Sequence, residues 1–341
     1  MTTPRYFDVL SEDTLQCRLC PRNCSIPPGE RGRCGVRGNR GGRGELPYSG
    51  FITALAEDPI EKKPLYHYRP GSFILSMGFV GCNLHCPFCQ NWSISQSTDA
   101  PGRPFTPEEL VAAAKSARIN QIAYTYSEPL IHAEFLLDCM KLAREAKLAN
   151  VLVSNGCVTG EAAADILPLL DAANIDLKSF SPETYARVLG GDLGAVLAFI
   201  RAARQVGLHL EVTTLIVPGL NDGPEETEAC AGFLAELSRQ GETAIPWHLS
   251  AYHPDYRWKA PPTDPALLEG IARRARRVLP YVYTGNVAGA ANNTPCPHCG
   301  FTLVERRAYR IDTRGLVLGE EKGKPCYHCA GCGKAVPLIR Y

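Results

Sequence analysis

Short apolar runs alternate with amphipathic stretches between about residue 70 and residue 290, and this is the clearest regular pattern in the chain. The apolar runs predict buried β-strands, and the stretches between them predict helices. Such alternation is typical of parallel strands with helices packed outside. The predicted strands are Ser72–Phe79, Gln121–Tyr126, Asn150–Val153, Ala173–Leu177, His209–Val217, Ile245–Tyr252 and Tyr281–Thr284.

Helix start signals stand in front of several of the predicted helices. Thr106 is expected as an N-cap that forms a capping box with Glu109, with proline at the first helical position. Ser181-Pro182 and residues 222–225 indicate further starts. Six or seven strand–helix units over about 215 residues predict an α/β fold with a closed or partly closed barrel. An open, doubly wound sheet is the alternative.

The two ends of the chain lack this alternation. Residues 1–50 are rich in Gly, Pro and Arg, and segment 31–47 predicts a loop around a metal site. Residues 291–341 contain cysteine pairs that flank short polar strands. We therefore expect an N-terminal cysteine module over residues 1–50, a core barrel over 51–290 and a C-terminal zinc-ribbon or rubredoxin-like module over 291–341.

Charge and composition exclude several classes of protein. The chain has 36 Lys and Arg residues against 35 Asp and Glu residues, a net charge of +1. This balance argues against broad electrostatic binding to nucleic acid or acidic membranes. No run approaches the roughly 20 apolar residues of a membrane span, and the first residues lack a signal-peptide pattern. We expect a cytoplasmic protein.

Cysteine is the unusual component, because 12 of the 15 cysteines fall into three closely spaced groups. In a reducing cytoplasm such spacing favours metal thiolates over disulfides. The central group is Cys82, Cys86 and Cys89, spaced C-x3-C-x2-C directly after the first predicted barrel strand. Active sites of such barrels lie at this end of the strands. Three thiolates can hold three irons of a cubane cluster and leave the fourth iron open, whereas ordinary electron-transfer clusters and structural zinc sites use four ligands. A zinc site with His85 as fourth ligand is the alternative.

With an aromatic residue, Phe88, before its last cysteine, this motif resembles the signature of the radical S-adenosylmethionine (radical SAM) superfamily. The resemblance covers roughly residues 70–290 and implies a partial (β/α)6-type, TIM-like barrel. It implies a 4Fe–4S cluster whose open iron is chelated by the methionine part of SAM. One electron from the cluster then cleaves SAM to a 5′-deoxyadenosyl radical, which takes a hydrogen atom from a substrate.

Short motifs at later strand ends resemble the branch of pyruvate formate-lyase activating enzymes. Ser127 and Glu128 stand where that branch has Gly-Gly-Glu, with Tyr126 and Ser127 replacing both glycines. Asn155 belongs to a matching Asn-Gly, Asp176 and Lys178 to a matching Asp-Leu-Lys, and His253 to a matching Tyr-His. The resemblance implies that these residues contact SAM. The cofactor-binding residues that we expect are therefore Phe88, Ser127, Glu128, Asn155, Asp176, Lys178 and His253.

Nearly the whole chain resembles the AmmeMemoRadiSam group within this superfamily, through segments 59–67 and 90–96 and both cysteine-rich ends. That resemblance implies Memo-type and Ammecr-type partner proteins. The superfamily implies an electron donor such as flavodoxin or ferredoxin. The hydrogen donor is expected to be either a backbone glycine of a protein or a small molecule.

The N-terminal group has four cysteines and the C-terminal group has five, of which four are expected to bind a metal. Cys296, Cys299, Cys329 and Cys332 form two C-x2-C-G knuckles and favour zinc over iron, although Cys326 offers another register. The N-terminal group suits zinc or a second iron–sulfur cluster equally, and consists of Cys17, Cys20, Cys24 and Cys34. Two alternatives stay open for the whole protein: a zinc- or iron-binding protein that modifies or binds nucleic acid, and a non-catalytic metal-binding electron carrier.

Overall fold

The computed structural model describes residues 3–241, 243–289, 292–321 and 323–340. The predicted boundary between residues 290 and 291 lies outside these residues. The chain divides into two compact units. The first contains the described residues up to Glu57, Ile74–Leu208 and Pro254–Lys259, and the second contains Asp58–Phe73, His209–His253 and the residues from Ala260 onward.

Parallel strands form the core of the first unit, in the order β8, β10, β11, β12. Leu75 of β8 lies opposite Ile122 of β10, and Leu152 of β11 lies opposite Ala173 of β12. Every residue of β10 is buried. Nearly all residues of these strands are buried, whichever face of the sheet they lie on, and this is why the strands read as continuous apolar runs. The bounds are β8 (Phe73–Gly78), β10 (Gln121–Thr125), β11 (Ala149–Ser154) and β12 (Ala172–Asp176).

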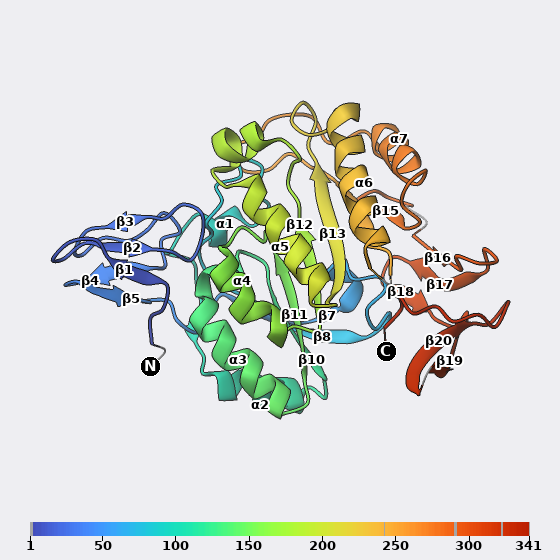
Figure 1. Ribbon diagram of the computed structural model, residues 1–341, viewed down its shortest axis with the longest axis horizontal. Coiled ribbons are helices and arrows are strands. Elements are labelled where there is room, and N and C mark those ends of the chain that lie inside the picture. The colour runs from blue at the N-terminus through green and yellow to red at the C-terminus, as the bar shows by residue number, and fades with distance from the viewer. Residues whose placement is uncertain (1–2, 242, 290–291, 322, 341) are drawn as a thin grey trace. The chain divides into compact units, whose positions relative to one another are not determined.

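Helices of the first unit connect these strands and lie along one side of them (Figure 1). Thr106 caps α2 through the predicted capping box with Glu109. Ser181 also marks a helix start, because its hydroxyl accepts a hydrogen bond from the Thr184 amide at 3.2 Å, and the turns that follow are π-helical over Thr184–Leu189. The helices are α1 (Trp92–Ser95), α2 (Pro107–Ser116), α3 (Ala133–Glu145), α4 (Gly160–Ile166) and α5 (Leu193–Gln205), with 3-10 turns at Pro129–His132 and Leu167–Leu169.

Short antiparallel strands build the N-terminal part of the first unit. The prediction of a loop over residues 31–47 is wrong in part, because β4 (Gly38–Arg40) and β5 (Arg43–Glu45) form a hairpin. Gly41 and Gly42 both have positive φ, which is the conformation that a two-residue hairpin turn requires. The other short strands are β1 (Phe7–Val9), β2 (Leu15–Cys17), β3 (Ser25–Ile26), β6 (Phe51–Ile52) and β9 (Arg103–Pro104).

The second unit has its own parallel strands in the order β13, β14, β15, and a C-terminal part made of antiparallel strands. Thr214 of β13 lies opposite Leu249 of β14. The parallel strands are β13 (His209–Ile216), β14 (Trp247–Ala251) and β15 (Val282–Gly285), with helices α6 (Pro224–Arg239) and α7 (Pro265–Ala275). The C-terminal strands are β16 (Thr294–Pro295), β17 (Thr302–Arg307), β18 (Arg310–Asp312), β19 (Leu316–Glu321) and β20 (Lys324–Cys329). β7 (Ala54–Pro59) and a 3-10 turn at Ile60–Lys62 precede β8.

The predicted α/β class is confirmed, since the central strands pair in parallel and alternate with helices. Each of the seven predicted strands is present to within two residues at both ends. The three predicted domain ranges stay predictions. Among the helices that the structure describes, none has the length and apolar character needed to cross a membrane.

Candidate active site

The C-x3-C-x2-C loop begins just after β8, at the carboxyl end of that strand. Gly81 has φ of +83°, and a Cβ atom there would lie 2.6 Å from the Cys34 carbonyl oxygen, so only glycine fits. The Gly81 amide donates to the Ile94 carbonyl at 2.8 Å, and the His85 amide donates to the Leu189 carbonyl at 2.8 Å. These bonds give the loop a fixed path over segments that are far apart in the sequence.

The cysteines of the loop are partly or fully buried, and two of their sulfurs have hydrogen-bond partners. The Leu84 amide and the Asn155 side-chain amide donate to Cys82 Sγ at 3.3 and 3.7 Å. Cys89 Sγ lies 3.2 Å from the Ser95 hydroxyl. Burial raises the pKa of Cys82 well above its usual value and that of Cys86 to about 12. The donor set therefore fits a metal cluster, because positively charged iron is what would keep such buried sulfurs as thiolates.

The zinc alternative with His85 is not supported by the geometry of that ring. His85 Nδ1 lies 2.6 Å from the Gln96 side-chain oxygen, and Arg33 Nε donates to His85 Nε2 at 3.0 Å. Both ring nitrogens are therefore already in use. Among the described residues, no group of three or more metal ligands with all donor atoms within 4.8 Å of one another includes His85.

Asp176 and Lys178 lie at the carboxyl end of β12 as an ion pair, with Nζ and Oδ2 2.8 Å apart. Burial alone would lower the pKa of Lys178, but the charges of Asp176 and Cys86 raise it above its usual value. The lysine therefore stays positive beside the cysteine loop. Both side chains keep some exposure, 30% for Asp176 and 21% for Lys178, so a ligand can reach them.

Glu128 and Asn155 are brought together at the ends of β10 and β11. The buried Glu128 carboxylate accepts hydrogen bonds from the Ser154 hydroxyl at 2.7 Å and from the amides of Leu130 and Asn155 at 2.9 Å. Burial raises the pKa of Glu128 to about 7, and these three donors oppose that rise. The Glu128 carboxylate therefore fixes the backbone around Asn155. That Glu128 contacts a cofactor stays a prediction.

Tyr126 and Ser127 occupy the segment where the family pattern has two glycines. Tyr126 has φ of +72°, a left-handed conformation that glycine adopts freely and tyrosine rarely does. The Asn91 side-chain amide donates to the Tyr126 carbonyl at 2.9 Å, and the Ser127 hydroxyl donates to the Phe79 carbonyl at 2.7 Å. The backbone therefore keeps a glycine-like shape despite the larger side chains.

His253 belongs to the second unit, just after β14, and is exposed. Its Nε2 atom lies 3.0 Å from the Asn286 carbonyl oxygen. The other expected cofactor-binding residues all belong to the first unit. That His253 lies near SAM stays a prediction.

Comparison with known proteins gives the family. A model of the radical SAM superfamily matches residues 77–231. The chain is 38% identical to uncharacterized protein MJ0808 of Methanocaldococcus jannaschii, over 99% of this chain and 100% of that protein. It is 25% identical to the pyruvate formate-lyase-activating enzyme of Clostridium pasteurianum, over 50% of this chain and 73% of that enzyme. The chain belongs to the radical SAM superfamily.

The fold agrees with this assignment. SuiB of Streptococcus suis, a solved structure, matches with a TM-score of 0.50 at 12% identity, over 63% of this chain and 49% of that chain. A likeness at this identity concerns the fold alone. Membership implies a 4Fe–4S cluster, SAM and an electron donor, so this protein is a radical SAM enzyme.

One feature of the site was missed by sequence reasoning. Segment 254–259 of this radical SAM enzyme lies against the cysteine loop, since the amides of Arg257 and Trp258 both donate to the Pro87 carbonyl at 2.9 Å. The ring of Phe88, which is buried, meets the Trp258 ring edge-on at 6.4 Å. The aromatic residues Tyr256 and Trp258, shortly after the predicted strand Ile245–Tyr252, were the signal that could have indicated this contact.

The C-terminal cysteines form a compact group that could hold a metal. The Sγ atoms of Cys296, Cys299, Cys329 and Cys332 all lie within 4.8 Å of one another. The Cys296–Cys332 and Cys299–Cys329 sulfur distances are 3.9 and 3.7 Å. A tetrahedral ion with metal–sulfur bonds of about 2.3 Å sets its sulfurs about 3.8 Å apart.

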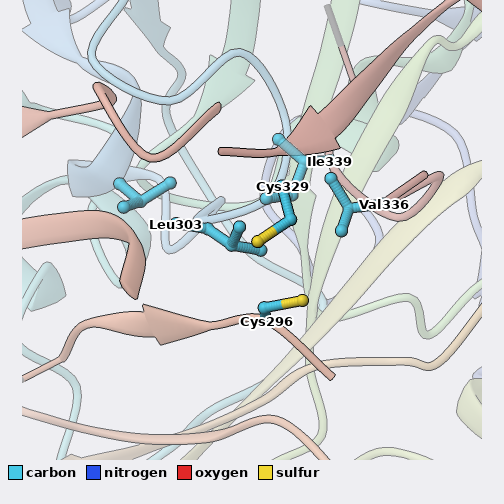
Figure 2. Close-up of a cluster of buried hydrophobic side chains, with 6 residues drawn as sticks. Cys296, Leu303, Cys329, Val336 and Ile339 are labelled. Atoms are coloured by element: carbon cyan, nitrogen blue, oxygen red, sulfur yellow. The ribbon is translucent and has the colours of Figure 1, made fainter. Parts of the chain in front are cut away.

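Buried side chains and backbone amides surround the C-terminal cysteines and fix their positions. Cys296 and Cys329 lie in a buried cluster with Leu303, Val336 and Ile339 (Figure 2). The amides of His298 and Gly331 donate to the Cys296 and Cys329 sulfurs at 3.5 and 3.3 Å. Cys326 lies outside the group, and its Sγ donates to the Tyr327 carbonyl at 3.4 Å.

The N-terminal cysteines are arranged differently. Cys17, Cys20, Cys24 and Cys34 line one small cavity together with Arg22, Arg37 and Asn83. Arg37 Nε donates to Cys17 Sγ at 3.3 Å, and its guanidinium forms a buried ion pair with Glu134 at 2.7 Å. Over the described residues, only the C-terminal group has all of its sulfur atoms within 4.8 Å of one another. The N-terminal sulfurs, like those of the central loop, are therefore spread more widely than around one tetrahedral ion.

Proposed function

We propose that Cys82, Cys86 and Cys89 hold the 4Fe–4S cluster of this enzyme and leave its fourth iron for SAM. The observation that carries the proposal is a loop of three sulfurs at the carboxyl end of β8, with the Asp176–Lys178 pair beside it. When bound, the cluster supplies one electron that breaks a C–S bond of SAM and yields a radical able to take hydrogen from a substrate. The chain's own residues bind and orient SAM.

Lys178 and Asp176 are proposed as the strongest of the SAM contacts. An ammonium group suits the methionine carboxylate, and a carboxylate accepts hydrogen bonds from the ribose hydroxyls. Ser127, Asn155 and the segment held by Glu128 are proposed to contact SAM from the neighbouring strand ends. Phe88 and His253 complete the proposed set, as residues next to the cluster and at the end of β14.

Replacing Lys178 with methionine tests this assignment. The change keeps a side chain of similar length and removes the charge, so we expect the affinity for SAM to fall about 10- to 100-fold, the size of one charge-assisted hydrogen bond. SAM binding to the reconstituted enzyme is measured by equilibrium dialysis. Lys115→Met, on an exposed position of α2, is the matched control and should bind as the wild type does. Equal affinities for both variants contradict the proposed role of Lys178.

We propose zinc for the C-terminal group, as a structural ion. Its donor set of four thiolates and its near-tetrahedral sulfur spacing support this choice. We expect Cys329→Ser to lose one zinc per chain and to lower the free energy of unfolding by about 4 kcal/mol or more, since metal binding at such sites stabilises the fold and its loss is among the most destabilising changes. Elemental analysis and thermal unfolding measure the two effects. Cys326→Ser is the control. Loss of zinc in that variant as well would contradict the assigned ligands.

For the N-terminal group we propose zinc or a second iron–sulfur cluster as a metal site that stabilises the first unit. We further propose that the protein belongs to the AmmeMemoRadiSam type, acts in the cytoplasm, receives its electron from flavodoxin or ferredoxin, and works with Memo-type and Ammecr-type partners. The hydrogen donor is a backbone glycine of a protein or a small molecule. Similarity to an activating enzyme supports the first of these.

A further inference from the structure

Asn83 is shared by two of the cysteine groups. It directly follows Cys82, the first cysteine of the central loop, and it also lines the cavity of the four N-terminal cysteines. Its side chain is only 2% exposed. A buried amide that touches two metal-binding segments has its orientation set by whatever hydrogen bonds it makes.

On the N-terminal side, Arg22 connects Asn83 to the cysteines. Arg22 lies between Cys20 and Cys24 in the sequence. Arg22 Nε donates to the Asn83 carbonyl oxygen at 2.9 Å. A metal held by Cys20 and Cys24 would fix the short segment that carries Arg22. The position of Arg22, and with it the Asn83 backbone, then depends on that metal.

On the side of the central loop, two hydrogen bonds in series connect the Asn83 side chain to the Cys82 sulfur. Asn83 Nδ2 donates to the Cys157 carbonyl at 2.7 Å. This bond turns the oxygen of the Asn83 amide toward Asn155. Asn83 Oδ1 accepts a hydrogen bond from Asn155 Nδ2 at 2.9 Å. The same Asn155 nitrogen reaches Cys82 Sγ at 3.7 Å. Asn83 therefore orients the group that donates to a sulfur of the proposed cluster.

We propose that Asn83 is a positioning residue through which the N-terminal metal module sets the hydrogen bond from Asn155 to the Cys82 thiolate, and thereby the reduction potential of the central cluster. The inference rests on the proposed function, because it takes Cys82 as a cluster ligand. A hydrogen bond to a cluster sulfur favours the reduced state, since reduction adds negative charge. Losing this bond therefore makes the cluster harder to reduce.

The test is the midpoint potential of the central cluster, measured by EPR on anaerobically reconstituted protein at fixed potentials. Asn83→Leu removes the hydrogen bonds of this side chain and keeps its branching at the γ-carbon. We expect its equilibrium constant for one-electron reduction to fall about tenfold, a shift of about 59 mV to more negative potential. Arg22→Ala interrupts the same link from the other side and should shift the potential in the same direction, which keeps the test valid if Asn83→Leu folds poorly.

A double-mutant cycle distinguishes this link from two independent effects. Cys20→Ala/Cys24→Ala, which removes N-terminal ligands, should lower the potential as Asn83→Leu does, and adding Asn83→Leu to it should give no further shift. Unchanged potentials, or shifts that simply add, overturn the inference and leave the proposed function intact. A wild-type protein that forms no central cluster at all overturns the proposed function, and the inference falls with it.

Discussion

Replacing Cys86 with alanine should remove the central cluster and abolish the cleavage of SAM. The central loop has three sulfurs and no spare, and Cys86 is buried beside Lys178. Removing a residue that hydrogen-bonds to a metal ligand typically lowers metal affinity or activity about 10- to 100-fold. Removing a ligand itself should lower them far more. Iron and sulfide content and the yield of 5′-deoxyadenosine measure the two effects.

Cys139→Ala is the matched control for this variant. Cys139 is also buried, with 1% exposure, but it lies within α3 and belongs to none of the cysteine groups. We expect it to keep the cluster and its activity and to lose only some stability. If Cys86→Ala retains wild-type iron content, the assignment of the loop as the cluster site is wrong.

Glu211→Gln should destabilise the second unit by about 3–5 kcal/mol, the cost of breaking a buried charged network. Glu211 is fully buried in β13. Its carboxylate accepts hydrogen bonds from His209 Nε2 at 3.0 Å and His248 Nε2 at 2.6 Å. The amides of Tyr66 and His67 donate to it at 3.1 and 2.8 Å. An amide at position 211 would direct its own N–H groups at some of these donors and leave them unsatisfied.

The stabilisation that Glu211 gives to the folded state should depend on pH. Burial alone would raise the pKa of Glu211, but the hydrogen bonds from His209 and His248 lower it well below its usual value of 4.5. The carboxylate therefore stabilises the folded state fully above about pH 4.5, and this contribution is lost as the pH falls further. We expect the stability difference between wild type and Glu211→Gln to narrow on acidification.

Urea unfolding followed by tryptophan fluorescence measures the effect. Trp247 of β14 is buried, and its indole donates to the Thr214 hydroxyl at 2.9 Å, so it reports on the packing of these strands. Glu236→Gln, on an exposed position of α6, is the control and should change stability by less than about 0.5 kcal/mol. Equal midpoints for both variants would show that the Glu211 network does not stabilise the fold.

The sequence was sufficient for the elements that depend on local pattern. The strands follow from apolar runs, and α2 begins at Thr106 because its capping box is local. The spacing of Cys82, Cys86 and Cys89 is local as well, and together with Phe88 it carried the resemblance that implied the chemistry. The paired cysteines of the C-terminal group likewise predicted four sulfurs close enough for one ion.

Features that depend on distant partners could not be predicted in the same way. Glu211 interrupts an apolar run, and nothing near it in sequence indicates that His248 and His67 surround it. The contact between Trp258 and Phe88 joins two residues that are 170 positions apart in the sequence. The hairpin of β4 and β5 was hidden because a glycine- and arginine-rich segment has no apolar alternation to mark its strands.

The central claim is that this protein cleaves SAM at a cluster held by its three-cysteine loop. The most direct test is to purify the protein without oxygen, reconstitute iron and sulfide, add dithionite and SAM, and quantify 5′-deoxyadenosine. The account predicts that the wild type forms 5′-deoxyadenosine and that Cys86→Ala does not. A wild-type protein with full cluster occupancy that forms no 5′-deoxyadenosine would contradict it.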